Sequence, residues 1–138
     1  MSPESPARSP WWRRWFGNRS ERAAAKFLKR QGYRIVARNY CSRHGELDLV
    51  AIDSGCVVFV EVRSTGTSDL TKTAASVDLV KQRRLTNLAL HFLQKKRLLH
   101  RPARFDVLIL SWPEDRKEPA ISHYRNAFEA VGRFQMYH

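Results

Sequence analysis

Residues 45–63 of the chain read GELDLVAIDSGCVVFVEVR. Two apolar runs rich in β-branched residues, 47–52 and 56–62, flank the turn signal Asp-Ser-Gly at 53–55. Glycine permits the positive φ that a tight turn needs, so the pattern predicts a β-hairpin with Ser54-Gly55 at its turn. In that register the facing pairs, which all lie on one side of the hairpin, are Ile52–Val57, Val50–Phe59, Asp48–Glu61 and Glu46–Arg63.

The shared face changes from apolar near the turn to acidic away from it. Two opposed carboxylates, Asp48 and Glu61, repel each other and are costly to desolvate beside a core unless a proton or a cation lies between them. A hard divalent cation such as Mg²⁺ would resolve this conflict. The alternative is a solvated end of the sheet with a Glu46–Arg63 surface ion pair, and periodicity alone does not choose between the two.

The composition fits one basic domain. The chain has 138 residues, with 25 Lys and Arg against 13 Asp and Glu and a formal net charge of +12. Such a charge favours polyanionic partners, namely DNA, RNA or an anionic membrane surface. The two cysteines, Cys41 and Cys56, lack metal-ligand spacing and are expected to be reduced thiols. No apolar run approaches the length of about 20 residues that spans a bilayer. We therefore expect a cytoplasmic protein with no membrane span.

The first 17 residues differ in composition from the rest. Residues 1–10 are rich in Pro and Ser, which predicts disorder. Residues 11–16, WWRRWF, combine aromatic rings with guanidinium groups and could stack on bases, lie at a membrane interface or fold back on the domain. We therefore predict a disordered or loosely attached segment over 1–17 and a single α/β domain over 18–138.

The remaining elements are predicted from hydrophobic periodicity and from residues that cap helices or form turns. Ser20 is a candidate N-cap for a helix over 21–31 that ends at Gly32 and carries Glu21 on its apolar stripe. The other predicted elements are a strand over 33–40, a polar loop over 64–74, a helix over 75–98, a buried strand over 105–110, a short edge strand over 121–124, and a tail from Asn126. The resulting order is α-β-β-β-α-β-β, a mixed sheet with helices on its faces in the α/β class.

Two basic residues interrupt the apolar stripe of the second helix. That stripe runs through Val77, Val80, Leu85, Leu88 and Phe92. Lys81 and Arg84 fall within it, although lysine is seldom buried without a partner. Their stems could snorkel over the edge of the core, or their charges could point at the carboxylates or at a bound phosphate. Both interpretations stay open. The five histidines show no metal-binding spacing and are expected to be surface or structural residues.

A set of motifs in fixed order resembles the uncharacterised bacterial YraN family. The resemblance covers about residues 17–128. The motifs are Glu21-x-x-Ala24-x-x-Phe27-Leu28-x-x-x-Gly32-Tyr33, Arg38-Asn39-Tyr40, Gly45-Glu46-Leu47-Asp48-Leu49-Val50, Phe59-Val60-Glu61-Val62-Arg63, Lys81, Arg84-Leu85, Ala89, Arg104-Phe105-Asp106 and Asn126-Ala127-Phe128. YraN-like proteins resemble the PD-(D/E)XK nuclease superfamily, which implies a three-layer, restriction-endonuclease-like core of α-β-β-β-α-β with a mixed central sheet and helices on both faces.

The resemblance also implies roles for individual residues. Asp48 matches the metal-binding Asp of the superfamily, Glu61 matches its second acid, and Glu21 matches the supplementary acid on the helix. Arg63 stands where the pattern has Lys, and arginine stays protonated, so it can bind phosphate but cannot act as a base. The family tends to carry a further basic residue where this chain has Thr65, and Lys81 could supply that charge.

Three hypotheses about function follow. The first is an endonuclease-like, Mg²⁺- or Mn²⁺-dependent protein that binds nucleic acid, DNA in preference to RNA. Its metal ligands would be Asp48, Glu61 and Glu21, its auxiliary acid Glu46, its charge-stabilising residues Arg63 and Lys81, and its backbone-binding residues Arg43, Arg63, Lys81 and Arg84. The second, which Arg63 favours, is a non-catalytic nucleic-acid-binding module that retains the nuclease fold. The third is an interaction protein that docks through its Trp/Arg segment. The oligomeric state is left open.

Overall fold

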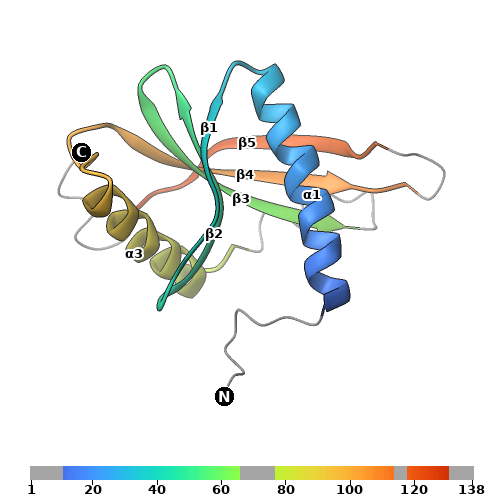
Figure 1. The fold of residues 1–138 in the computed structure, drawn as a ribbon, viewed down its shortest axis with the longest axis horizontal. Helices are drawn as coiled ribbons and strands as arrows, with labels where there is room; N and C mark the ends of the chain where they lie inside the picture. Colours follow the sequence, from blue (N-terminus) through green and yellow to red (C-terminus); the bar gives the residue numbers. More distant parts are fainter. Residues whose placement is uncertain (1–10, 66–76, 114–117, 131–138) are drawn as a thin grey trace.

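The computed structural model describes residues 11–65, 77–113 and 118–130, with the backbone alone for 11–18 and Thr65. Its elements are α1 (Trp11–Arg30), β1 (Arg34–Ser42), β2 (Gly45–Asp53), β3 (Cys56–Thr65), α3 (Leu79–Lys95), β4 (Ala103–Ser111) and β5 (Ala120–Phe128) (Figure 1). The predicted order α-β-β-β-α-β-β is confirmed. The predictions for residues 1–10, for most of the loop 64–74 and for the tail after 130 lie outside the described residues.

The five strands form one mixed sheet in the order β1-β2-β3-β4-β5. Neighbouring strands are antiparallel except β3 and β4, which are parallel. A parallel pair needs a crossover connection, and the segment that contains α3 provides it. Among the described residues, no helix is long and apolar enough to span a bilayer.

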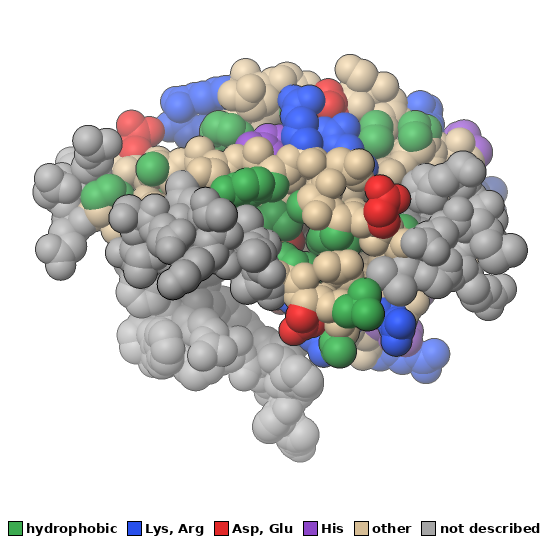
Figure 2. Space-filling model, turned by 180° about the vertical axis from the view of Figure 1, so that it is seen from behind, with side chains coloured by type: hydrophobic (Ala, Val, Ile, Leu, Met, Phe, Trp, Pro, Cys, Tyr) green, Lys and Arg blue, Asp and Glu red, His purple; other side chains and the backbone are tan. Residues whose placement is uncertain are grey.

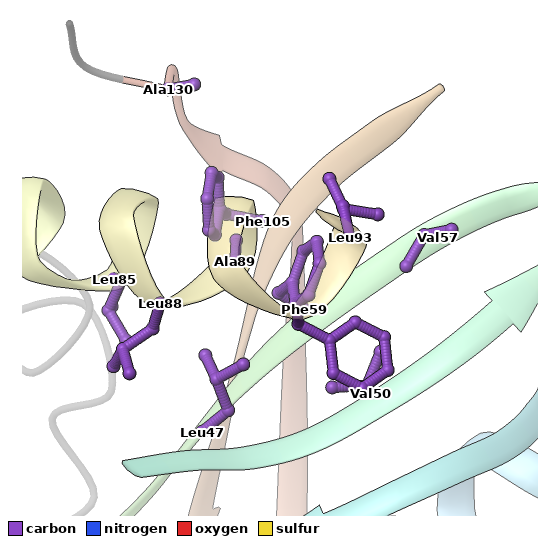
Figure 3. Close-up of a cluster of buried hydrophobic side chains, with 11 residues drawn as sticks. Leu47, Val50, Val57, Phe59, Leu85, Leu88, Ala89, Leu93, Phe105 and Ala130 are labelled. Atoms are coloured by element: carbon purple, nitrogen blue, oxygen red, sulfur yellow. The ribbon is translucent and has the colours of Figure 1, made fainter. Parts of the chain in front are cut away.

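The two helices cover opposite faces of the sheet. Val58 and Val60 of β3 belong to the buried cluster beneath α1, which also contains Ala24 and Leu28. Val57 and Phe59 belong instead to the cluster beneath α3, shown in Figure 3 with Leu88, Leu93 and Phe105. Successive side chains of a strand point to opposite faces, so the apolar run of β3 serves both layers. The predicted three-layer α/β arrangement, with helices on both faces, is confirmed.

Helix α1 begins nine residues before the predicted cap, at Trp11. The prediction that Ser20 caps the helix is therefore wrong. Its side chain lies buried inside α1, where the hydroxyl contacts the Ser64 hydroxyl and accepts a hydrogen bond from Trp112 Nε1 at 3.2 Å. These partners satisfy a polar group that would otherwise favour a cap position. The predicted end before Gly32 is confirmed, because that residue has a φ of +95°.

Helix α3 is shorter at its start than predicted. Asp78 caps it, and its Oδ1 accepts a hydrogen bond from the Lys81 backbone N–H at 2.8 Å. Val77, which was predicted to belong to the apolar stripe, is buried just before the helix. The assignment of Val80 to the buried stripe is wrong, because this side chain is 69% exposed. With the helix starting at Leu79, Val80 lies in the first turn and projects away from the sheet.

The last strand is longer than predicted. It runs from Ala120 to Phe128, so Asn126 belongs to β5 and does not begin a tail. The pairing of β4 with β5 shifts between Phe105–Phe128 and Val107–Tyr124. Asn126, with a φ of +51°, lies in this irregular stretch, where the bulge needs a residue that tolerates a positive φ.

Candidate functional site where strands β2 and β3 diverge

Strands β2 and β3 part at Asp48. The predicted hairpin register is confirmed near the turn, where Ile52 pairs with Val57 and Val50 with Phe59. The ladder ends at Leu49–Val60, because β3 continues along β4 while β2 continues along β1. The predicted facing pairs Asp48–Glu61 and Glu46–Arg63 are therefore not backbone partners in the described sheet. Glu46 pairs instead with Cys41 of β1.

We call the place beyond Leu49 and Val60, where strands β2 and β3 diverge, the fork. The Asp48 side chain lies in this fork. Its Oδ2 accepts a hydrogen bond from the Val62 backbone N–H at 2.8 Å, which ties β2 to β3 just beyond the end of their ladder. Burial and then the charge of Glu61 raise the pKa of Asp48 well above its usual range, and the charges of Glu21 and Glu46 raise it further. The Val62 hydrogen bond opposes this shift. Three other acids, from α1, β2 and β3, therefore lie close enough to Asp48 for their charges to affect it.

Glu21 reaches this cluster from the first helix. The pKa of Glu21 is raised, mainly by burial, and a hydrogen bond from the Asn39 side chain partly offsets this shift. Asn39 lies in β1 with a φ of +52°, between residues that pair with Leu47 and Leu49 and therefore opposite Asp48. Asn39 was not among the predicted site residues. The available signal was an asparagine in an otherwise strand-like run, because asparagine tolerates positive φ better than its neighbours.

Two cations neutralise Glu61. Lys81 Nζ of α3 lies 2.5 Å from Glu61 Oε2, and Arg63 Nε lies 3.9 Å from the same oxygen. The Glu61 side chain is only 10% exposed, whereas that of Lys81 is 36% exposed. The basic residue within the helix stripe thus points at a carboxylate, the second of the two interpretations above. Its partial exposure leaves the ammonium group accessible to an anionic ligand.

The other two predicted basic residues lie at the tip of the β1–β2 hairpin and on the part of α3 beside it. Arg43 is exposed in the turn between these strands. Arg84 is exposed on α3, and its aliphatic stem lies beside Gly45, where an added Cβ would come within 3.6 Å of Arg84 Cδ. Figure 1 shows this hairpin reaching over α3. The structure thus brings Asp48, Glu61, Arg63 and Lys81 together and places Arg43 and Arg84 at the neighbouring turn.

The carboxylate oxygens of Asp48 and Glu61 suit a magnesium site in which the protein supplies only a few of the ligands. Within residues 11–65, 77–113 and 118–130, no three His, Cys, Asp or Glu side chains form a group that could hold a metal ion. Asp48 and Glu61 offer a pair of hard carboxylate oxygens. Mg²⁺ is commonly held by one or two carboxylates together with waters and substrate phosphates, and the pair suits that arrangement.

Asp48 is expected to destabilise the metal-free protein near neutral pH. Because folding raises its pKa, the stabilising contribution of Asp48 is present below the unfolded-chain pKa of about 3.9 and is lost as the pH rises through the folded-state pKa. Asp48→Asn removes the buried charge and keeps an acceptor for Val62. We expect it to raise the free energy of unfolding by about 1 kcal/mol at pH 7 in EDTA.

Urea unfolding at pH 7 and pH 4 measures this effect. The difference between Asp48→Asn and wild type should shrink at pH 4, where the wild-type carboxyl is largely protonated. Glu129→Gln removes one charge from an exposed position and is the matched control, with no expected change. A less stable Asp48→Asn protein at pH 7 would contradict the electrostatic account of the fork.

Comparison with known proteins places the chain in a family. A model of the uncharacterised protein family UPF0102 matches residues 20–110, a range that holds every site residue described above. The chain belongs to this family. It is 42% identical over 119 residues to a UPF0102 protein of Rhodopirellula baltica, a match that covers 84% of this chain and 71% of the relative.

Other UPF0102 proteins match at similar levels. The chain is 43% identical over 113 residues to one from Alcanivorax borkumensis, with 81% of this chain and 90% of the relative covered. It is 37% identical over 116 residues to one from Pelotomaculum thermopropionicum, with 84% and 97% covered. The YraN-type resemblance is thus confirmed at the level of the family. The family description carries no activity, so the function of this UPF0102 protein must be argued from its site.

Proposed function

We propose that this UPF0102 protein is an endonuclease-like, metal-dependent phosphodiester hydrolase that acts on nucleic acid. The observation that carries the proposal is the fork, where Asp48 and Glu61 lie close enough for their charges to interact and Lys81 contacts Glu61. A carboxylate whose pKa is strongly raised by burial and by a neighbouring acid is typical of functional sites. The net charge of +12 favours a polyanionic substrate.

The two carboxylates of the fork would hold Mg²⁺ or Mn²⁺. A bound ion would lower the pKa of a coordinated water and offset the charge of the scissile phosphate. Asp48 is fixed in orientation by the Val62 N–H, so one of its oxygens is held on β3 while the other remains for ligation. Glu21 and Glu46 add negative potential at the same place, as their effects on the pKa of Asp48 show. They would support the site as auxiliary acids.

The cations beside Glu61 would act on the substrate. Lys81 could exchange its contact with Glu61 for a phosphate oxygen once the negative charge of Glu61 is otherwise neutralised. The guanidinium group of Arg63 would bind phosphate and stabilise developing negative charge, because arginine offers a planar set of donors but no general base. A water near the carboxylates would then have to lose its proton to a group other than Arg63.

A second function has its own support. Glu61 is already neutralised by Lys81 and approached by Arg63, and the chain carries arginine at the position of the expected lysine. This arrangement suits a module that binds nucleic acid without cleaving it. Such a module would use the same basic residues for backbone contacts, and its affinity would fall steeply as the salt concentration rises.

Cleavage assays separate the two functions. We expect the wild-type protein to nick plasmid DNA with Mn²⁺ or Mg²⁺ and to stop in EDTA, with DNA cleaved in preference to RNA. Lys81→Met should lower the rate about 10²–10³-fold, as expected for the loss of one charge-stabilising group. Arg63→Lys, which restores the superfamily residue, should retain or increase the rate.

The control for these variants is Arg83→Met, an exposed basic residue on the same helix, which should cleave like the wild type. A protein that binds DNA but cleaves nothing with either metal, as wild type and as Arg63→Lys, would favour the non-catalytic module.

A further inference from the structure

A second charged feature lies on the opposite flank of α1 from the fork. A groove of about 470 Å³ runs between α1 and the start of β5. Its basic lining residues are Arg19, Arg22, Lys26 and Arg30 of α1, and its other lining residues are Ala23, Phe27, Trp112, Glu118, Pro119 and Ile121. We call this the α1 groove. Four cations and one acid line it among the described residues, so positive charge predominates in its described lining.

The α1 groove is separate from the carboxylate fork. Glu21 turns toward Asn39 of β1, whereas the groove lies against Ile121 of β5. Strands β1 and β5 are the two edges of the sheet. Within α1, Arg22, Lys26 and Arg30 are exposed while Ala25 and Leu28 are buried, so the basic row lies away from the face packed on the sheet. A ligand in the groove would therefore not touch Asp48 or Glu61.

The spacing of the cations suits a phosphate backbone. Arg22, Lys26 and Arg30 follow one another at intervals of four residues, which corresponds to a rise of about 6 Å between successive positions. That interval is comparable to the separation of successive phosphates in an extended strand. Long Lys and Arg side chains on one helix row can each reach a different phosphate.

The groove also offers aromatic surface. The Arg19 guanidinium lies over the Trp112 ring, 3.6 Å from its centroid, and Trp112 is anchored by its Nε1 hydrogen bond to Ser20. Phe27 lines the same groove. Fixed aromatic rings beside a row of cations are the combination that binds single-stranded nucleic acid, because bases stack on rings and guanidinium planes while cations hold the phosphates.

From these observations we infer that the α1 groove is a binding site for single-stranded nucleic acid, separate from the site of chemistry. The inference rests on the proposed function, in which the partner is nucleic acid. It adds the place on the protein where a single strand binds. A concave groove with aromatic walls suits bases better than it suits a membrane, which flat amphipathic faces contact. Figure 2, the view from behind Figure 1, shows further basic side chains along the upper edge and at the lower right, whereas the acidic side chains there stand singly.

The test measures binding of a fluorescent oligothymidylate of about 12 nucleotides in EDTA, by anisotropy over a series of salt concentrations. The groove variant is Arg22→Gln/Lys26→Gln/Arg30→Gln, and glutamine keeps the helix propensity of these exposed positions. The control variant is Lys29→Gln/Arg83→Gln/Lys95→Gln, which removes the same charge from exposed positions outside the groove. Circular dichroism checks that both variants are folded.

We expect the groove variant to lose at least about tenfold in affinity and to reduce the salt slope by about 2, since each lost phosphate contact on a single strand contributes about 0.7. The control variant should stay close to wild type. Trp112→Leu should weaken binding about tenfold through lost stacking. Equal losses in both triple variants would overturn the inference, because binding would then depend on net charge alone.

Three further outcomes separate this inference from the proposed function. If the wild type binds anionic vesicles through the groove and no oligothymidylate, the groove is a membrane site and the inference fails. If the oligonucleotide binds and the groove variant is unaffected, the inference fails while hydrolysis at the fork can still hold. If the groove variant alone loses binding and Asp48→Asn/Glu61→Gln retains it, the inference holds whether or not the protein cleaves.

Discussion

Replacing Asp106 by alanine is expected to lower the free energy of unfolding by about 3–5 kcal/mol, the cost of breaking a buried charge network from one side. Asp106 is fully buried in β4. Its Oδ1 accepts hydrogen bonds from Arg104 Nε and the Asn126 N–H, both at 3.0 Å, and its Oδ2 lies 2.7 Å from His123 Nε2. The same carboxylate thus holds β5 at its bulge and orients Arg104.

The pH dependence of this effect has a definite sign. Burial alone would raise the pKa of Asp106, but hydrogen bonds from His123, Arg104 and Asn126 outweigh burial and lower it. The stability that Asp106 contributes is therefore present above the unfolded-chain pKa of about 3.9 and is lost as the pH falls through the lower folded-state pKa. The difference between wild type and Asp106→Ala should be constant around neutral pH and should shrink in strong acid.

Urea unfolding at several pH values measures this difference. Asp53→Ala is the matched control. The Asp53 side chain is 24% exposed, and its Oδ2 lies 3.2 Å from Nη2 of the same arginine, Arg104. Asp53 is more exposed than Asp106 and its ion pair is only partly buried, so this variant should lose about 1 kcal/mol, near the upper end for exposed pairs. Equal losses in the two variants would show that Asp106 is no more than another partner of Arg104.

Replacing Glu61 by glutamine is expected to lower metal-dependent cleavage at least about 10²–10³-fold. Glutamine preserves the size of the side chain and can still accept a hydrogen bond from Lys81, so the fork should remain folded. It removes the negative charge that, with Asp48, would hold a divalent ion. Glu129→Gln changes the same group at an exposed position away from the fork and should cleave like wild type.

The assay follows nicking of plasmid DNA as the Mn²⁺ concentration is raised. A loss that high Mn²⁺ partly restores would indicate weakened metal binding by the remaining Asp48. Unchanged cleavage by Glu61→Gln would remove Glu61 from the proposed chemistry and assign its role to the ion pair with Lys81.

The parts of the fold that depend on local pattern could be predicted from the sequence. The hairpin register follows from alternation on both sides of Ser54-Gly55, and the structure has the same pairs near the turn. The convergence of Asp48 and Glu61 follows from that register, even though the strands have already parted there. The end of α1 at Gly32 follows from the requirement for positive φ.

The features that depend on distant partners could not be predicted. Ser20 has the local signature of a cap, and what keeps it inside the helix are Ser64 and Trp112, which lie 44 and 92 positions away. The fork at Asp48 forms because β3 pairs with β4 as far as Thr65, beyond the point where its pairing with β2 ends. The sequence of the hairpin does not indicate this pairing with β4. The Asp106 network likewise joins residues of β4 and β5 that are distant in sequence. The motifs that contain Arg104, Asp106 and Asn126 do not show that these residues share one carboxylate.

The central claim is that Asp48 and Glu61 together hold a divalent cation, and calorimetric titration with Mn²⁺ tests it most directly. It is performed on wild type, Asp48→Asn/Glu61→Gln and Glu129→Gln, each with and without a short oligonucleotide that could complete the coordination through its phosphates. We predict binding at one site in wild type and Glu129→Gln and none in the double variant. Equal binding in all three proteins, or no binding by wild type even with the oligonucleotide, would contradict the account.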